Sequence, residues 1–149
     1  MKKTISHLLA FAIIIVLFLN LFSCISPEEY YSNKAIQVDV GFHSCTSTTK
    51  EFTLYYDTLR MGDKYSLPNE SKGVYDVDFV ISYIGDDGIY ITFTQPLDRI
   101  VDDGKWDTEI STVILCEKSV EKLITPTDGG GVSYTFSIIN REDIPPQIG

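Results

Sequence analysis

The sequence predicts an all-β domain on the strength of two features. Beyond residue 35, short runs of residues alternate between hydrophobic and polar side chains. Clusters of Gly, Asp, Asn and Pro separate these runs, as is typical of strands joined by turns. About seven strands organised in this way predict an antiparallel β-sandwich, immunoglobulin-like in general shape, with a small β-barrel as the alternative.

Each expected strand has one hydrophobic face, because successive side chains of a strand point to opposite sides of a sheet. The sequence between residues 75 and 94 contains two such runs, separated by Gly85, Asp86, Asp87 and Gly88, and this spacing predicts a hairpin. Residues 113–115 are hydrophobic in succession, which is typical of a central strand. The expected strands are, in order, residues 36–42, 51–56, 75–83, 89–94, 109–117 and 132–138.

The segments between these strands are expected to be loops and turns. Residues 59–72 are rich in turn-forming side chains and predict a long loop. Residues 117–123 are expected to form one helical turn at most. Further turns are expected at residues 102–104 and 128–131, where Asp and Gly follow one another.

A different segment precedes the domain. Residues 8–22 are rich in hydrophobic side chains and follow Lys2 and Lys3. A transmembrane helix needs about 20 such residues, and this run is shorter and contains Asn20. The pattern therefore predicts a helical secretory signal peptide that is removed from the mature protein.

The end of this segment resembles the cleavage box of bacterial lipoproteins. Leu21 stands three residues before Cys24, and the small residue Ser23 directly precedes it. The resemblance implies a signal peptide over residues 1–23 and a Cys24 that carries acyl chains such as palmitate. It also implies a protein anchored in the bacterial cell envelope, at the outer membrane, on its periplasmic or its surface face. The alternatives are an ordinary signal peptide with a chance cysteine, or an uncleaved anchor.

The mature chain is expected to consist of a lipidated tether, residues 24–34, and a β-domain, residues 35–149. After removal of the two leader lysines, 21 acidic side chains face 10 basic ones, so the net charge is near −11. Phosphate binding requires clustered Lys and Arg, and this balance therefore argues against a nucleic-acid partner. The membrane is expected to be reached through the lipid anchor.

Two cysteines remain if Cys24 is lipidated. Cys45 and Cys116 form an even pair in an exported chain, and such a pair predicts a disulfide. The alternative is two buried free thiols that behave as small hydrophobic groups.

Candidate catalytic and metal-binding residues are few. His43 lies two residues before Cys45, so the two would share a strand face and form either a metal site or a nucleophile pair. The acidic turns at residues 86–87, 102–103 and 128 suggest a calcium site, although Asp is also an ordinary turn residue. No complete constellation emerges, and the prediction is a protein without catalytic residues, metal or cofactor.

Exposed tyrosines are the remaining functional signal. Tyr55 and Tyr90 fall on the polar faces of their strands, as a protein or carbohydrate contact surface requires. Cross-strand stabilisation of an exposed sheet face is the alternative. The sequence therefore predicts a lipid-anchored, non-enzymatic binding or structural module of the cell envelope. An acidic inhibitor or immunity-type binder of a cationic envelope protein and a calcium-binding adhesion-type module are the alternatives.

Overall fold

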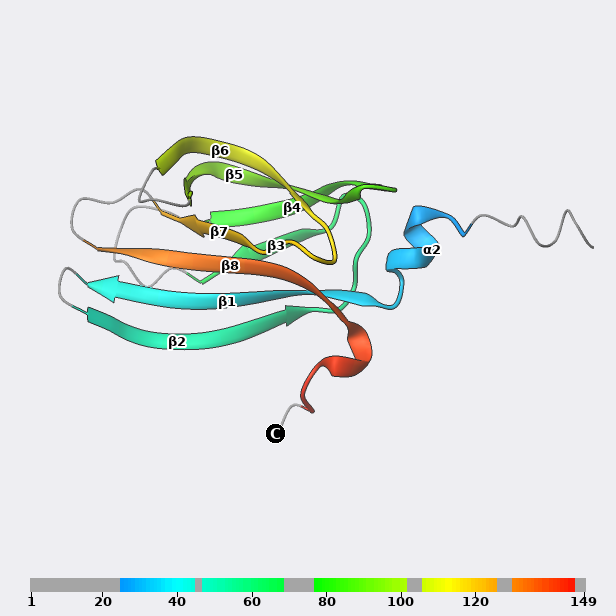
Figure 1. Ribbon diagram of the computed structural model, residues 1–149, viewed down its shortest axis with the longest axis horizontal. Helices are drawn as coiled ribbons and strands as arrows, with labels where there is room; N and C mark the ends of the chain where they lie inside the picture. Colours follow the sequence, from blue (N-terminus) through cyan, green and yellow to red (C-terminus); the bar gives the residue numbers. More distant parts are fainter. Residues whose placement is uncertain (1–24, 45–46, 69–76, 102–105, 126–129, 147–149) are drawn as a thin grey trace, which may run out of the picture.

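The computed structural model describes residues 25–44, 47–68, 77–101, 106–125 and 130–146 (Figure 1). The described residues begin with the short helix α2 (Pro27–Tyr31), and a 3-10 helix, η2 (Arg141–Asp143), follows the last described strand. The strands between them are β1 (Lys34–Ser44), β2 (Ser47–Tyr56), β3 (Lys64–Leu67), β4 (Val77–Gly85), β5 (Gly88–Ile100), β6 (Trp106–Leu115), β7 (Glu121–Ile124) and β8 (Gly130–Asn140). The all-β prediction is thus confirmed.

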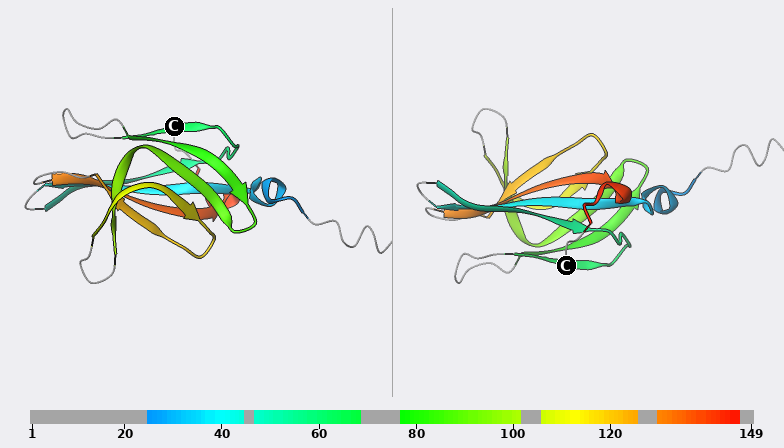
Figure 2. Two further views of the ribbon diagram at one scale, coloured as in Figure 1. Left: turned by 90° about the horizontal axis from the view of Figure 1, so that it is seen from above. Right: turned by 90° about the horizontal axis from the view of Figure 1, so that it is seen from below.

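The eight strands form one antiparallel sheet, in the order β2-β1-β8-β7-β5-β4-β3, with β6 paired to β5. The sheet curls into a half-barrel, and Figure 2 shows β4 and β5 arching across β1 and β8. This single curled sheet replaces the two separate sheets of the predicted sandwich.

Strand β5 explains why one sheet can enclose a core. Its first half pairs with β4 and its last residues, Asp98 and Arg99, pair with β7, while β6 pairs along the opposite edge. Pro96 lies where the register with β6 shifts, and a proline has no N–H to give to a sheet. The sheet therefore divides at β5 into two arms that face each other. One arm contains β4 and β3, and the other contains β7, β8, β1 and β2.

The core lies between these arms. Phe136 of β8 contacts Phe79 of β4 and Phe93 of β5, with ring centroids 5.8 and 5.6 Å apart. Tyr134, fully buried, donates a hydrogen bond to the Pro68 carbonyl oxygen at 3.1 Å. The alternating hydrophobic residues of the sequence supply this core, as their period of two requires.

The arms also meet where β2 and β3 end. Tyr56 contacts Tyr65, with ring centroids 4.8 Å apart, and its hydroxyl donates to the Ser66 carbonyl oxygen at 3.0 Å. Strand β3 lies inside the segment that was expected to be a long loop, so that prediction is wrong for Lys64–Leu67. Its pattern was too short to recognise, yet its backbone pairs fully with β4.

Three other expectations need correction. A register shift between Ile81 and Tyr83 turns Tyr83 outward, 53% exposed, and Ile84 inward, so Tyr83 does not join the core face. Strand β7 occupies part of the segment where a helical turn was expected. Residues 25–34 are not a simple solvated spacer, because Pro27–Tyr31 is helical and Tyr31 is buried.

Candidate functional site

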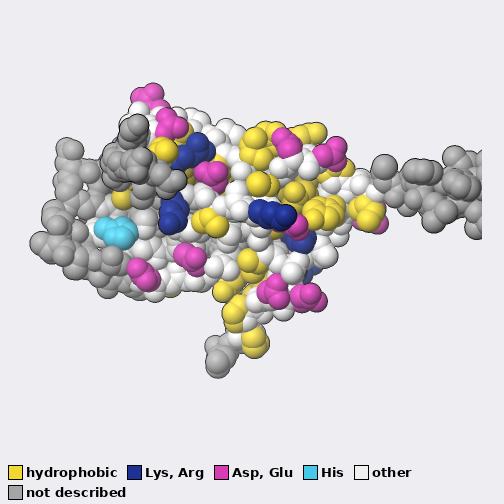
Figure 3. All heavy atoms as spheres, viewed as in Figure 1, with side chains coloured by type: hydrophobic (Ala, Val, Ile, Leu, Met, Phe, Trp, Pro, Cys, Tyr) yellow, Lys and Arg dark blue, Asp and Glu magenta, His cyan; other side chains and the backbone are white. Residues whose placement is uncertain are grey.

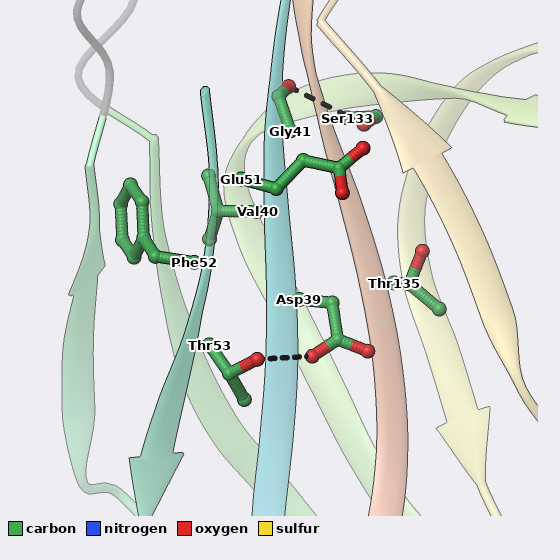
Figure 4. A pocket seen from close by; sticks show the side chains of 8 residues that line it. All are labelled: Asp39, Val40, Gly41, Glu51, Phe52, Thr53, Ser133 and Thr135. Atoms are coloured by element: carbon green, nitrogen blue, oxygen red, sulfur yellow. Dashed lines mark hydrogen bonds between the residues drawn. The ribbon is translucent and has the colours of Figure 1, made fainter. Parts of the chain in front are cut away.

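The outer face of strands β2, β1 and β8 carries a polar depression centred on Gly41 (Figure 4). The strand registers place two rows of residues side by side across it. One row is Thr53, Asp39 and Thr135, and the other is Glu51, Gly41 and Ser133. The depression has a volume of about 410 Å³, and its polar side chains point away from the core.

Neighbouring side chains lie directly over Gly41. A Cβ atom on residue 41 would lie 2.8 Å from Ser133 Oγ and 3.2 Å from His43 Nε2. Both distances are shorter than an ordinary van der Waals contact. The Ser133 and His43 side chains therefore occupy the space that a larger residue at position 41 would need.

Ser133 lines one side of the depression, and His43 lies next to it. His43 Nε2 lies 2.7 Å from Ser133 Oγ, and the Ser133 hydroxyl donates to the Gly41 carbonyl oxygen at 3.3 Å. The tautomer of the imidazole determines which atom of the His43–Ser133 pair is the donor.

Asp39 occupies the lower side. Thr53 Oγ1 donates to its carboxylate at 2.7 Å and Gln37 Nε2 at 3.1 Å, so the carboxylate is held in a fixed position. Neither Lys nor Arg is among the eight residues that line the depression, whereas Asp39 and Glu51 are. Lys122 of β7 continues the row beyond Thr135. The arrangement offers carboxylate and hydroxyl oxygens to a ligand that carries N–H groups or positive charge.

The sequence did not predict most of these residues as members of a site. His43 was singled out together with Cys45, but the structure brings it to Ser133. Ser133 and Glu51 belong to strands that the sequence predicts, yet their meeting depends on the order of β2, β1 and β8. Gly41 in the middle of a hydrophobic alternation was the one available signal, because a glycine inside a strand often marks close approach of another group.

The structure places the predicted cysteines as follows. Cys24 and Cys45 lie outside the described residues, and Cys116 is a free thiol whose Sγ lies 3.1 Å from Ser119 Oγ. Glu117, next to Cys116, forms an ion pair with Lys34 at the start of β1. Because Cys45 lies outside the described residues, the Cys45–Cys116 disulfide stays a prediction.

Tyr55 and Tyr90 do not form a common surface. Tyr55 pairs with Gln37 on β1, and three strands separate β2 from β5. The Tyr90 ring contacts Tyr83, with centroids 5.4 Å apart, and its hydroxyl donates to Asp87. The contact with Tyr83 is the cross-strand pairing that the sequence left as an alternative, and the hydrogen bond to Asp87 holds the ring in place.

The acidic turns give no metal centre within the described part of the chain. Asp86 and Asp87 form the turn between β4 and β5, while residues 102–103 and 128 lie outside the described residues. Among the residues described, no group of three or more His, Cys, Asp or Glu side chains is placed to hold a metal ion.

Within the described ranges, no helix has the length and hydrophobicity needed to cross a bilayer.

Comparison of the whole chain with known proteins found no matching family model, no matching curated protein and no matching solved structure.

Proposed function

We propose that this chain is a lipid-anchored protein of the bacterial cell envelope, held at the outer membrane by Cys24, and that its β-domain is a non-enzymatic binding module. The observation that carries the proposal is the position of Cys24. It directly follows the hydrophobic leader and stands three residues before helix α2. Acyl chains on this cysteine contribute about 0.8 kcal/mol for each buried methylene, enough for stable anchoring when more than one chain is attached.

The polar depression is the candidate binding site of this module. Gly41 lies seven residues along β1 from Lys34, so the depression is about 23 Å from the end of the domain where the anchor begins. A ligand site at that distance from the membrane is accessible to partners in the surrounding fluid. Its Asp39 carboxylate, held by Thr53 and Gln37, and the nearby Ser133 hydroxyl are suited to binding a polar ligand.

The partner that this site favours is cationic. Asp39 and Glu51 line the depression without a lysine or arginine among its lining residues, and the mature chain carries a net charge near −11. Opposite charge accelerates association and selects the partner. An acidic inhibitor or immunity-type binder of a basic envelope protein is therefore the second candidate function, and it uses the same site.

The anchor is tested by expressing the full chain with its own leader in a bacterial host. Intact mass and detergent partitioning should show an acylated chain that begins at Cys24. Cys24→Ser should abolish acylation and leave the protein soluble or uncleaved, whereas the matched control Cys116→Ser should behave as the wild type. An unacylated wild-type chain cleaved elsewhere would contradict the proposal.

The binding site is tested with an arginine-rich peptide as the cationic probe. NMR titration at low salt should shift the amide signals of residues 39–41, 51–53 and 133–135, and the shifts should weaken as salt is added. The double change Asp39→Asn and Glu51→Gln should remove them. Asp86→Asn with Asp107→Asn, an equal loss of charge elsewhere, is the control. Equal binding by both double variants would rule out the depression as the cationic site.

A further inference from the structure

The exposed hydrophobic side chains gather at one end of the molecule. Seven large hydrophobic residues are exposed within the described ranges, and six of them belong to the α2 segment or to strand ends and turns that Figure 1 places on the same side of the molecule. Figure 3 shows hydrophobic side chains gathered over this end. We call this cluster the α2-end patch; its members are Ile25, Tyr30, Met61, Tyr83, Ile114 and Val120.

The patch contains an ordered row of side chains across three strands. Tyr83 of β4 pairs with Tyr90 of β5, and Tyr90 pairs with Ile114 of β6. Tyr83 is 53% exposed and Ile114 is 40% exposed. The row lies beside the β4–β5 turn, which adjoins α2.

The next row along the same outer face is polar. Thr92 Oγ1 donates to Ser82 Oγ at 2.9 Å and lies 3.1 Å from Thr112 Oγ1. Two residues along β5 and β6 from the Tyr90–Ile114 pair, the outward side chains are thus hydrogen-bonded hydroxyls instead of rings and aliphatic groups. The change from the Tyr83–Tyr90–Ile114 row to these hydroxyls runs across β4, β5 and β6, beside the half-buried Val80.

Helix α2 brings the anchor close to the patch. Tyr31 is buried at 5% exposure, and the Tyr30 ring contacts it edge-on with centroids 5.0 Å apart. The ion pair of Lys34 with Glu117 holds the start of β1 beside the end of β6. Only Ile25 and Ser26 separate Cys24 from Pro27, a reach of about 10 Å when extended.

From this geometry we propose that the α2-end patch docks on the lipid bilayer, so that the domain stands on the membrane in one orientation. The inference rests on the proposed anchoring through Cys24. A two-residue link holds the patch within the headgroup region, where tyrosine is favoured because its ring is apolar and its hydroxyl is wet. The Gly41 depression then faces away from the bilayer.

The charges around the patch specify the kind of surface. Arg60, Arg141 and Glu28 line a pocket of about 640 Å³ beside α2, together with Met61 and Ile84. The pocket thus offers guanidinium groups to a headgroup phosphate and a carboxylate to a headgroup amine, above an apolar contact. Asp86 and Asp87 at the β4–β5 turn oppose a strongly anionic surface. The patch therefore fits zwitterionic phospholipid better than anionic phospholipid.

The test couples the chain to vesicles chemically and so does not depend on acylation in the cell. The mature chain, residues 24–149 with Cys45→Ser and Cys116→Ser, is joined through Cys24 to a maleimide lipid in phosphatidylcholine vesicles. The reference is the same chain joined to a soluble polyethylene glycol. Amide hydrogen exchange around the β4–β5 turn should be roughly threefold or more slower on vesicles, and exchange of residues 38–42 should be unchanged.

Paired variants decide whether the tyrosines cause the protection. Tyr83→Ser with Tyr90→Ser should remove it, while Tyr55→Ser, on the far outer face, should retain it; exchange of the glycol-linked variants reports whether they fold. Equal exchange on vesicles and on glycol would overturn the docking. Protection that increases with added phosphatidylglycerol would also overturn it, because Arg60 and Arg141 would then drive the contact. If the chain is not acylated in the cell but the coupled chain still docks, only the proposed anchoring through Cys24 is contradicted.

Discussion

Gly88 closes the turn between β4 and β5 in a backbone conformation that few other residues adopt. Its φ is +148°, and an added Cβ would overlap the Leu115 carbonyl oxygen on β6. Gly62 also has a positive φ, +87°, but nothing lies within 4 Å of its missing side chain. A side chain at position 62 would therefore add backbone strain alone, whereas a side chain at position 88 would add both strain and steric overlap.

We expect Gly88→Ala to lower the free energy of unfolding by roughly 3 kcal/mol, because strain and overlap add. Gly62→Ala should cost only about 1 kcal/mol, since strain acts alone. Urea denaturation of both variants measures the difference. Equal losses would mean that β6 moves aside without penalty.

Thr125 is the one buried polar residue among those described, and it joins β7 to β8. Its hydroxyl accepts a hydrogen bond from the Val132 N–H at 3.0 Å, and its own N–H donates to the Val132 carbonyl oxygen. The side chain thus satisfies a backbone donor that water cannot reach.

Thr125→Val should lower the free energy of unfolding by about 1–2 kcal/mol, because the Val132 N–H is left without an acceptor. Thr125→Ser keeps the hydroxyl and should cost less. Thermal unfolding of both variants checks the order. A more stable valine variant would show that the hydroxyl is dispensable.

Single residues show where sequence reasoning stops. The alternation in β1 and β8 predicts that Ser133 lies on a polar face. It does not predict that His43, 90 residues away in sequence, meets that serine. Such a contact depends on strand order and register, which are set by the packing of the whole core.

The elements themselves were more predictable than their contacts. The strong alternations around β1, β4, β5 and β8 each correspond to a strand, and the Asp86–Asp87 turn confirms the predicted hairpin. β3 and β7, of four residues each, were missed because so short a segment carries no readable period. The bulge that turns Tyr83 outward was missed because nothing in the local pattern marks it.

Tyr56 of β2 and Tyr65 of β3, which contact each other where the two arms meet, have phenol groups with raised pKa values. Burial raises the pKa of Tyr56 to about 12, and burial together with Asp63 raises the pKa of Tyr65 to about 12. Burial also raises the pKa of Tyr134. In each case the folded protein binds the phenolic proton more tightly than the unfolded chain does.

The contribution of these phenols to stability should therefore be constant below pH 10 and fall as the pH rises from 10 to 12, by at most about 1.4 kcal/mol per pH unit for each phenol. Urea denaturation across this range measures the slope. Tyr56→Phe should reduce the slope, because it removes one of these phenols. A flat profile up to pH 12 would refute this account.

At the scale of the whole molecule, the two ends differ in character. The α2 end carries the hydrophobic patch, and the other half carries the polar depression on the outside of β1. Composition predicted an acidic domain but not this difference between the two ends, because the patch is assembled from five separate segments of the chain.

The thiols of the mature chain can be counted directly. Because Cys116 is a free thiol in the structure, we expect two reactive thiols in the chain beginning at Ile25. A thiol-reactive chromophore added to unfolded, unreduced protein counts them. The Cys116→Ser variant should show one thiol. No reactive thiol in the monomeric wild type would restore the predicted disulfide.

Strand β1 has one neighbour that is close in sequence and one that is distant. β2 follows it directly, whereas β8, its partner along all eleven residues, begins at Gly130. A chain emerging from its N-terminus therefore presents β1 long before the strand that covers its second edge exists. The domain closes only after residues 130–140 have been synthesised, so the order of synthesis keeps this edge unpaired until then.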